Sequence, residues 1–224
     1  MRVVLTREAG RNDSLEDWLP EGASCTHVPL TRTKYYEPQR VSEALDAIGE
    51  RGTFRSLVVT SERSHSYARL AVDASAPDVE VFSVGPATSV ALAGAGVAVG
   101  HRGDGGAVTL APLIEHGPVL VLGAKEMRHD LVDALRERGL DVHVVACYET
   151  LALAPTEAHQ LLLRSADVVF IGAPSAWAVA RDFVGAHAWI VVPGATTGAV
   201  VAEDHERVLE GWGPNLRQRL ANIE

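Results

Sequence analysis

Hydroxyl-bearing, small and cationic residues follow short apolar runs at six places along this sequence. In chain order, these positions are Arg7, Thr60-Ser61, Gly85 with Thr88, Lys125, Ser175 and Thr196-Thr197. In an open parallel sheet, ligands bind beyond the carboxyl ends of the strands. We expect each segment to open a helix, where free N–H groups and the positive dipole end favour anions. The pattern therefore predicts an anion-binding site lined by N–H and hydroxyl donors.

Helix capping is the alternative explanation for the same residues. Serine and threonine are common N-cap residues, so each hydroxyl could simply accept a hydrogen bond from the first turn of its helix. This explanation accounts for any one segment, whereas the recurrence in both halves of the chain favours a binding site.

Motifs of the common catalytic and cofactor sites are missing from the sequence. It contains no GxxxxGK[ST] loop and no GxSxG elbow, and "GHRGDGGAV" (100–108) departs from the GxGxxG spacing. The nine histidines are scattered, and neither Cys25 nor Cys147 has a histidine at ligand spacing. We therefore expect no metal and no organic cofactor, and we interpret the histidines as surface or core residues.

Apolar strand patterns alternate with helical patterns along the whole chain. The predicted strands cover 2–6, 24–30, 56–60, 79–84, 118–123, 141–146, 167–172 and 188–192. Helical patterns include "SLEDWLPEG", "PSAWAVARDFV" and "HDLVDALRERG", in which Leu131, Ala134 and Leu135 share one face and Gly139 follows as a C-cap. This alternation predicts βαβ units, a mostly parallel sheet and the α/β fold class.

An internal repeat suggests two similar subdomains. "RVVLTREAGRNDSLEDWLPEGASCTHVPL" aligns with "PVLVLGAKEMRHDLVDALRERGLDVHVVAC", and "VGPATSVAL" aligns with "VPGATTGAV". In each pair, small and hydroxyl residues come directly after a strand. Repeated units of this size are typical of duplicated structural modules.

Composition narrows the class of protein further. The 224 residues carry a formal net charge of −9, which argues against a general nucleic-acid binder. No apolar run reaches the roughly 20 residues that a membrane helix needs, and an acid occurs within the first eight residues, unlike in a signal peptide. We expect a cytoplasmic protein that binds no membrane.

The ordered motifs resemble the uroporphyrinogen-III synthase family. They are "VVLTREAGRNDSLEDWLPEGASCTHVPL", "VVTSERS", "VFSVGPATSVALAGAGV", "VLVLGAKEMRHDLVDALRERGLDVHVVACYET", "DVVFIGAPSAWAV" and "PGATTGAVV". The resemblance implies two Rossmann-like or flavodoxin-like parallel-sheet subdomains, joined by a two-stranded connector, with a cleft between them. It places 1–33 plus 151–224 in the first subdomain, 37–147 in the second, and 31–38 and 147–154 in the connector.

The resemblance also implies a reaction and a catalytic residue. The family cyclises the linear tetrapyrrole hydroxymethylbilane to uroporphyrinogen III, with inversion of ring D and loss of water. Its tyrosine most often linked to catalysis matches Tyr148 in "CYET". A tyrosine hydroxyl is protonated at neutral pH, so it can donate a proton to the leaving hydroxyl. The alternative is a structural tyrosine that packs at the hinge and donates a hydrogen bond to a backbone carbonyl.

The resemblance assigns substrate contacts to the residues after the strands. These are Arg7, Thr60, Ser61, Gly85, Thr88, Lys125, Arg128, Ser175, Thr196 and Thr197, with Arg11, Arg32 and Arg63 as further sources of positive potential. Two positions depart from the family pattern, because Gly172-Ala173 replaces a Thr-Ser pair and Gly123-Ala124 replaces an arginine-glycine pair.

Two other functions remain open at this level. A non-catalytic tetrapyrrole-binding or regulatory relative would have the same fold, and a two-lobed protein that binds small molecules would share the α/β pattern. We expect hydroxymethylbilane as the small-molecule partner, and a monomeric protein.

Overall fold

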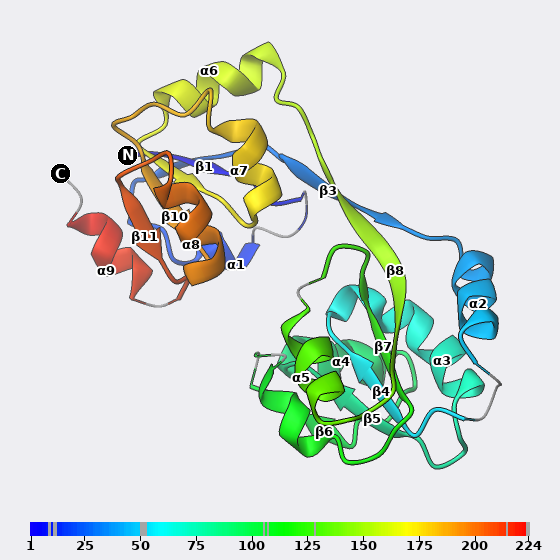
Figure 1. Ribbon diagram of the computed structural model, residues 1–224. Coiled ribbons are helices and arrows are strands. Elements are labelled where there is room, and N and C mark those ends of the chain that lie inside the picture. The colour runs from blue at the N-terminus through cyan, green and yellow to red at the C-terminus, as the bar shows by residue number, and fades with distance from the viewer. Residues whose placement is uncertain are drawn as a thin grey trace. The chain divides into compact units, whose positions relative to one another are not determined.

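The computed structural model describes residues 1–8, 10, 13–49, 53–104, 106, 108–127, 129–213 and 215–222. The chain divides into two compact units, which Figure 1 shows with their helices and strands. Unit 1 comprises Met1–Thr33 and Leu151–Glu224, and unit 2 comprises Lys34–Thr150. Among the described residues, no helix is long and apolar enough to cross a bilayer.

Unit 1 is built on a five-stranded sheet in the order β11-β10-β9-β1-β2. Every pairing in this order is parallel. The strands are β1 (Arg2–Leu5), β2 (Ser24–His27), β9 (Val168–Phe170), β10 (Trp189–Val192) and β11 (Val208–Glu210). The three inner strands β1, β9 and β10 are buried over most of their length on both faces, as parallel strands between helices must be, whereas the edge strands β2 and β11 are only partly buried.

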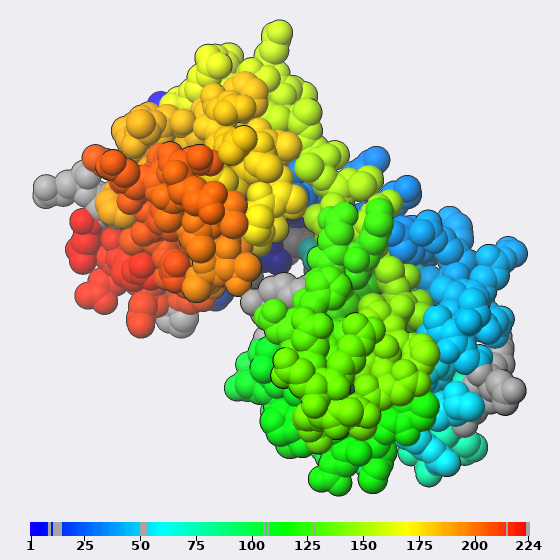
Figure 2. All heavy atoms as spheres, viewed as in Figure 1, coloured from blue at the N-terminus to red at the C-terminus, as the bar shows by residue number. Residues whose placement is uncertain are grey.

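Helices cover both faces of this sheet because neighbouring strand residues point to opposite sides. Val4 packs with α6 (Glu157–Ser165), α7 (Pro174–Ala180) and α8 (Ala195–Ala202). Val3 and Leu5 pack on the other side, with Leu15 of α1 (Asp13–Glu16) and Leu216 of α9 (Leu216–Ala221). In the space-filling view, α8 and α9 form much of the visible surface of unit 1 (Figure 2).

Unit 2 contains a six-stranded sheet in the order β3-β8-β7-β4-β5-β6. The strands are β3 (Thr31–Tyr35), β4 (Ser56–Val59), β5 (Glu80–Ser83), β6 (His101–Arg102), β7 (Val119–Ala124) and β8 (Val142–Ala152). The pairings from β8 through β7, β4 and β5 to β6 are parallel.

Two layers of helices enclose the sheet of unit 2. Leu120 and Leu122 face α2 (Pro38–Ala47), α3 (His65–Ala74) and α4 (Pro86–Gly94). Val119 and Val121 face α5 (Asp130–Glu137) and the 3₁₀ helix η2 (Val108–Leu113). The alternation along β7 therefore divides the core of unit 2 into two layers.

Strands β3 and β8 contain the boundaries between the units, which fall after Thr33 and after Thr150. Leu153 N donates to Leu30 O at 2.8 Å, and Tyr36 N donates to Cys147 O at 3.0 Å. Residue numbers rise along one strand as they fall along the other, so β3 and β8 are antiparallel.

The predicted α/β class is confirmed, with differences at several element ends. All eight predicted strands form, although β8 continues to Ala152, and β3, β6 and β11 were not in the predicted set. Gly139 has φ +80°, as expected of a C-cap glycine after α5, and Leu131 and Leu135 are buried. The pattern "SLEDWLPEG" gives only the short α1, because Pro20 follows it.

Candidate functional site

Helices α4 and α8 begin at the carboxyl ends of strands β5 and β10, and side-chain capping does not explain the residues at these two helix starts. Gly85 is the N-cap of α4 and Gly194 is the N-cap of α8, and neither helix has a side-chain cap. Thr88 and Thr197 occupy the third position of these helices and are 6% and 5% exposed. The N-terminal N–H groups of both helices thus keep their capacity for an anion.

Capping does explain Ser61 in unit 2. Its Oγ accepts a hydrogen bond of 3.2 Å from the N–H of Arg63, at the start of the 3₁₀ helix η1 (Glu62–Ser64). The hydroxyl of Thr60 also has a structural partner, because its Oγ1 donates a hydrogen bond to Leu122 O at 3.0 Å. Both hydroxyl oxygens retain lone pairs, but their primary contacts are structural.

Ser175 and Thr196 lie in the first turns of α7 and α8 in unit 1. Ala173 is the N-cap of α7, without a side-chain cap, so Ser175 is not a capping residue. Thr196 is exposed, whereas Ser175 is half-buried. These hydroxyls therefore lie beside the N–H groups at the carboxyl edge of their own sheet.

Arg7 and Lys125 correct one expectation, because neither opens a helix. Arg7 follows β1, but α1 begins only at Asp13; Lys125 lies in a turn, and α5 begins at Asp130. Their positive charges come from side chains in loops, not from helix starts. Arg11 and Arg128 lie outside the described residues.

The side chain of Arg7 lies beside Gly172, just after the end of β9 in unit 1. Its guanidinium carbon lies 5.2 Å from the ring centroid of Trp212, within the range of a cation–π contact. The next residue, Glu8, accepts two hydrogen bonds from Thr33, each of 2.7 Å, from the backbone N–H and from the hydroxyl. A fixed carboxylate thus anchors the segment that carries the arginine.

A β-bulge in β8 sets the direction in which the Tyr148 side chain points. Strict alternation would point Tyr148 away from the core side of Cys147, but the register slips so that Gly123 pairs with Ala146 and Ala124 pairs with Tyr148. Cys147 is the extra residue of the bulge. Both side chains therefore join the same core layer, and Tyr148 is only 5% exposed.

The hydroxyl of Tyr148 nevertheless reaches the surface. Within the described part of the chain it has no hydrogen-bond partner, and it is not among the unpartnered polar atoms sealed from solvent. The ring is held by Tyr35 at 6.2 Å between centroids and by the guanidinium of Arg63 at 5.7 Å. A fixed ring with an available hydroxyl suits a proton donor.

Glu149, the residue after Tyr148, forms ion pairs with both lysines of the chain. Lys34 Nζ lies 3.1 Å from Oε1, and Lys125 Nζ lies 3.4 Å from Oε2. The hydrogen bond from Lys34 is the main cause that lowers the pKa of the Glu149 carboxyl. The sequence patterns did not indicate Lys34 or Glu149 as site residues, although the presence of only two lysines among 20 basic residues was a usable signal.

The thiol of Cys147 is unreactive, although the residue lies beside Tyr148. Burial raises the pKa of its thiol to about 12, so the thiol stays protonated at neutral pH. The nucleophilic thiolate is therefore not available at this edge.

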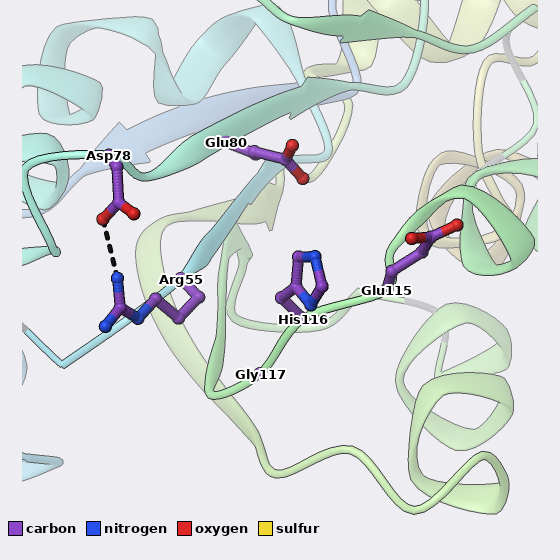
Figure 3. A pocket seen from close by; sticks show the side chains of 6 residues that line it. All are labelled: Arg55, Asp78, Glu80, Glu115, His116 and Gly117. Carbon is purple, nitrogen blue, oxygen red and sulfur yellow. Dashed lines mark hydrogen bonds and ion pairs between the residues drawn. The ribbon is translucent and has the colours of Figure 1, made fainter.

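A surface pocket of about 580 Å³ lies at the opposite edge of the unit 2 sheet (Figure 3). Its lining residues precede or begin strands β4, β5 and β7: Arg55, Asp78, Glu80, Glu115, His116 and Gly117. Arg55 is paired with Asp78 at 2.7 Å, which leaves the lining acidic. This pocket contains none of the predicted site residues and is unsuited to an anionic ligand.

One histidine departs from the expectation that no histidine meets a cysteine at ligand spacing. Cys25 and His27 lie two residues apart on β2, and Glu16 of α1 lies beside them. Their ligand atoms are all within 4.8 Å of one another. The strand period of two residues places Cys25 and His27 on one face, and the preceding helix α1 brings Glu16 beside them.

The fold and these strand ends define a class: an α/β protein of two parallel-sheet units, each with uncapped helix starts at its carboxyl edge. Solved structures share the fold. A mutant uroporphyrinogen III synthase from Thermus thermophilus is 17% identical, with a TM-score of 0.63, over 100% of this chain and 98% of that one. The uroporphyrinogen-III synthetase from Helicobacter pylori is 18% identical, with a TM-score of 0.62, over 99% and 98%.

The family model for uroporphyrinogen-III synthase HemD matches residues 19–206. The chain belongs to the uroporphyrinogen-III synthase family. A search of curated proteins gave no significant match.

Proposed function

We propose that this protein is a lyase that cyclises hydroxymethylbilane to uroporphyrinogen III. The observation that carries the proposal is the bulge on β8, which holds the ring of Tyr148 and leaves its hydroxyl available at the carboxyl edge of unit 2. Membership of the uroporphyrinogen-III synthase family supports the same reaction.

Tyr148 is proposed to act as the general acid. The substrate loses a hydroxyl from its ring A end, and ring D is then attacked at its substituted carbon, through a spiro intermediate that rearranges. Proton donation to the departing hydroxyl removes it as water, and one such donor contributes roughly 10²–10⁴-fold in rate. Positioning of the folded substrate supplies much of the remainder.

Substrate carboxylates are proposed to bind the donors of both units. In unit 2 these are the start of α4 with Gly85 and Thr88, together with Thr60, Ser61 and Lys125. In unit 1 they are Arg7, Ser175, Thr196 and Thr197. N–H groups and hydroxyls bind carboxylates without many cations, which reconciles a polyanionic substrate with a net charge of −9.

The decisive experiment supplies hydroxymethylbilane to the purified protein and separates isomers I and III by chromatography. Hydroxymethylbilane closes slowly by itself to isomer I, so a protein-dependent excess of isomer III supports the proposal. A non-catalytic tetrapyrrole-binding relative would bind the product and leave only isomer I. That result would reject the enzyme in favour of the binding protein.

A further inference from the structure

Glu16, Cys25 and His27 form a compact group of metal-ligand types in unit 1. Cys25 and His27 point to the same side of β2, since side chains two residues apart on a strand share a face. Glu16 ends α1, and its Oε1 lies 2.7 Å from His27 Nε2. All three ligand atoms lie within 4.8 Å of one another.

The donor set matches one class of cation. A thiolate, an imidazole and a carboxylate are the ligands that zinc prefers, at distances of about 2.0–2.3 Å, whereas calcium and magnesium prefer oxygen alone. Three protein ligands leave a fourth tetrahedral position for water. Small side-chain movements would bring the three ligand atoms to tetrahedral positions around one zinc ion. The side chains of Glu16 and His27 are exposed enough to move in this way.

We propose that Glu16, Cys25 and His27 bind a Zn²⁺ ion that fastens α1 to β2. Zinc replaces the proton of the Cys25 thiol, forms a Zn–S bond and releases that proton to solvent. The carboxylate of Glu16, which lies beside the thiol, attracts the cation that takes the place of the proton.

A simpler role for these residues is an ion pair between His27 and Glu16, with Cys25 packed against the core. The two roles differ in what Cys25 contributes. An ion pair does not involve the thiol, whereas a zinc site loses a ligand when the sulfur is removed. The proposal concerns unit 1 alone and is independent of the function assigned to Tyr148.

The test titrates the metal-free protein with zinc against a chromogenic zinc indicator. We expect one zinc per chain, and Cys25→Ser and His27→Asn each to weaken binding by at least about tenfold. Two matched controls should bind as the parent does. Cys147→Ala removes the other, fully buried thiol, and His143→Asn removes a histidine that pairs with Asp141 at 3.0 Å without a cysteine nearby.

Two further measurements separate a zinc site from a loss of folding. Cobalt(II) bound to the parent should give a thiolate charge-transfer band that Cys25→Ser lacks and Cys147→Ala retains. Zinc should also slow alkylation of Cys25, followed by peptide mass spectrometry. A parent that binds no zinc, or a Cys25→Ser variant that binds it equally well, would overturn the proposal.

Discussion

Units 1 and 2 have the same kind of helix start at the carboxyl ends of their strands, and they differ in the charged and aromatic side chains nearby. Both place a glycine N-cap before a helix whose third residue is a buried threonine, Thr88 in α4 and Thr197 in α8. Unit 1 adds an arginine stacked on an indole, and unit 2 adds a tyrosine on a bulge beside a carboxylate that joins two lysines. The repeated plan thus places helix N–H groups without a side-chain cap at equivalent positions in the two units, while the tyrosine that we propose as the proton donor occurs in unit 2.

Aromatic residues follow the same division. All four tryptophans, Trp18, Trp177, Trp189 and Trp212, lie in unit 1, and all four tyrosines, Tyr35, Tyr36, Tyr67 and Tyr148, lie in unit 2. Tryptophan fluorescence therefore reports on unit 1 alone, which allows a variant's effect to be assigned to one unit.

The largest expected effect is on the rate of Tyr148→Phe. Loss of the hydroxyl should slow formation of isomer III by at least about tenfold, because a general acid contributes roughly 10²–10⁴-fold. Unfolding should hardly change, since the hydroxyl has no partner among the described residues. The measurement is kcat for isomer III, alongside a urea unfolding curve.

Tyr67→Phe is the matched control in the same unit. The hydroxyl of Tyr67 donates to the backbone oxygen of Tyr36, so its loss should lower the free energy of unfolding by about 0.5–1.5 kcal/mol. Its rate should stay near that of the parent. If Tyr148→Phe instead behaved like Tyr67→Phe, Tyr148 would be a structural residue.

The second prediction compares glycines at the two carboxyl edges. A Cβ at Gly123 would lie 2.6 Å from Thr60 Oγ1 and 3.0 Å from Met127 Sδ, so Gly123→Ala should cost about 1–3 kcal/mol through overpacking. A Cβ at Gly172 would lie 3.4 Å from Arg7 Cγ, an ordinary contact. Gly172→Ala should therefore change stability by less than about 0.5 kcal/mol.

Urea unfolding, followed by tryptophan fluorescence for unit 1 and by hydrogen exchange of unit 2 peptides, measures both variants. Equal losses of stability would mean that the edges are packed alike. The close approach of Thr60 supplies a packing reason for glycine at position 123.

The smallest predicted effect is the acid sensitivity of Glu149. Its pKa is lowered in the folded protein, so its ion pairs stabilise unit 2 above the unfolded pKa of about 4.3 and lose this effect as the pH falls through the folded value. Glu149→Gln should remove that part of the pH dependence from hydrogen exchange in unit 2. The control variant is Asp167→Asn in unit 1. The hydrogen bond that the backbone N–H of Arg2 donates to Asp167 is the main cause that lowers the pKa of this carboxyl. An unchanged pH profile in Glu149→Gln would show that the lysines do not stabilise the strands.

Sequence patterns predicted the repeating features of this fold well and the unique ones poorly. Apolar runs located the buried strands because parallel strands are apolar on both faces. Short edge strands such as β6 and β11 bury little and leave no such run. The bulge at Cys147 was missed because one inserted residue changes the facing of Tyr148 without altering the composition of the strand.

The sequence patterns also failed to indicate side-chain clusters that combine residues of different elements. Glu16, Cys25 and His27 combine a helix with a strand, and Lys34 meets Glu149 across 115 positions of sequence. Spacing along the chain predicts neighbours only within one element, so such clusters require the tertiary fold.

The split course of unit 1 has a consequence during synthesis on the ribosome. β1 is made first, but its partner β9 follows about 160 residues later, which at about 5–20 residues per second is on the order of ten seconds. All the strands that pair in unit 2 emerge within that interval. The inserted unit can therefore fold while the apolar residues Val3, Val4 and Leu5 have only β2 beside them and still lack their second partner strand, β9. Because transiently exposed apolar segments promote aggregation, we expect nascent chains to be most prone to aggregate in this interval, when a chaperone that binds short apolar segments would act.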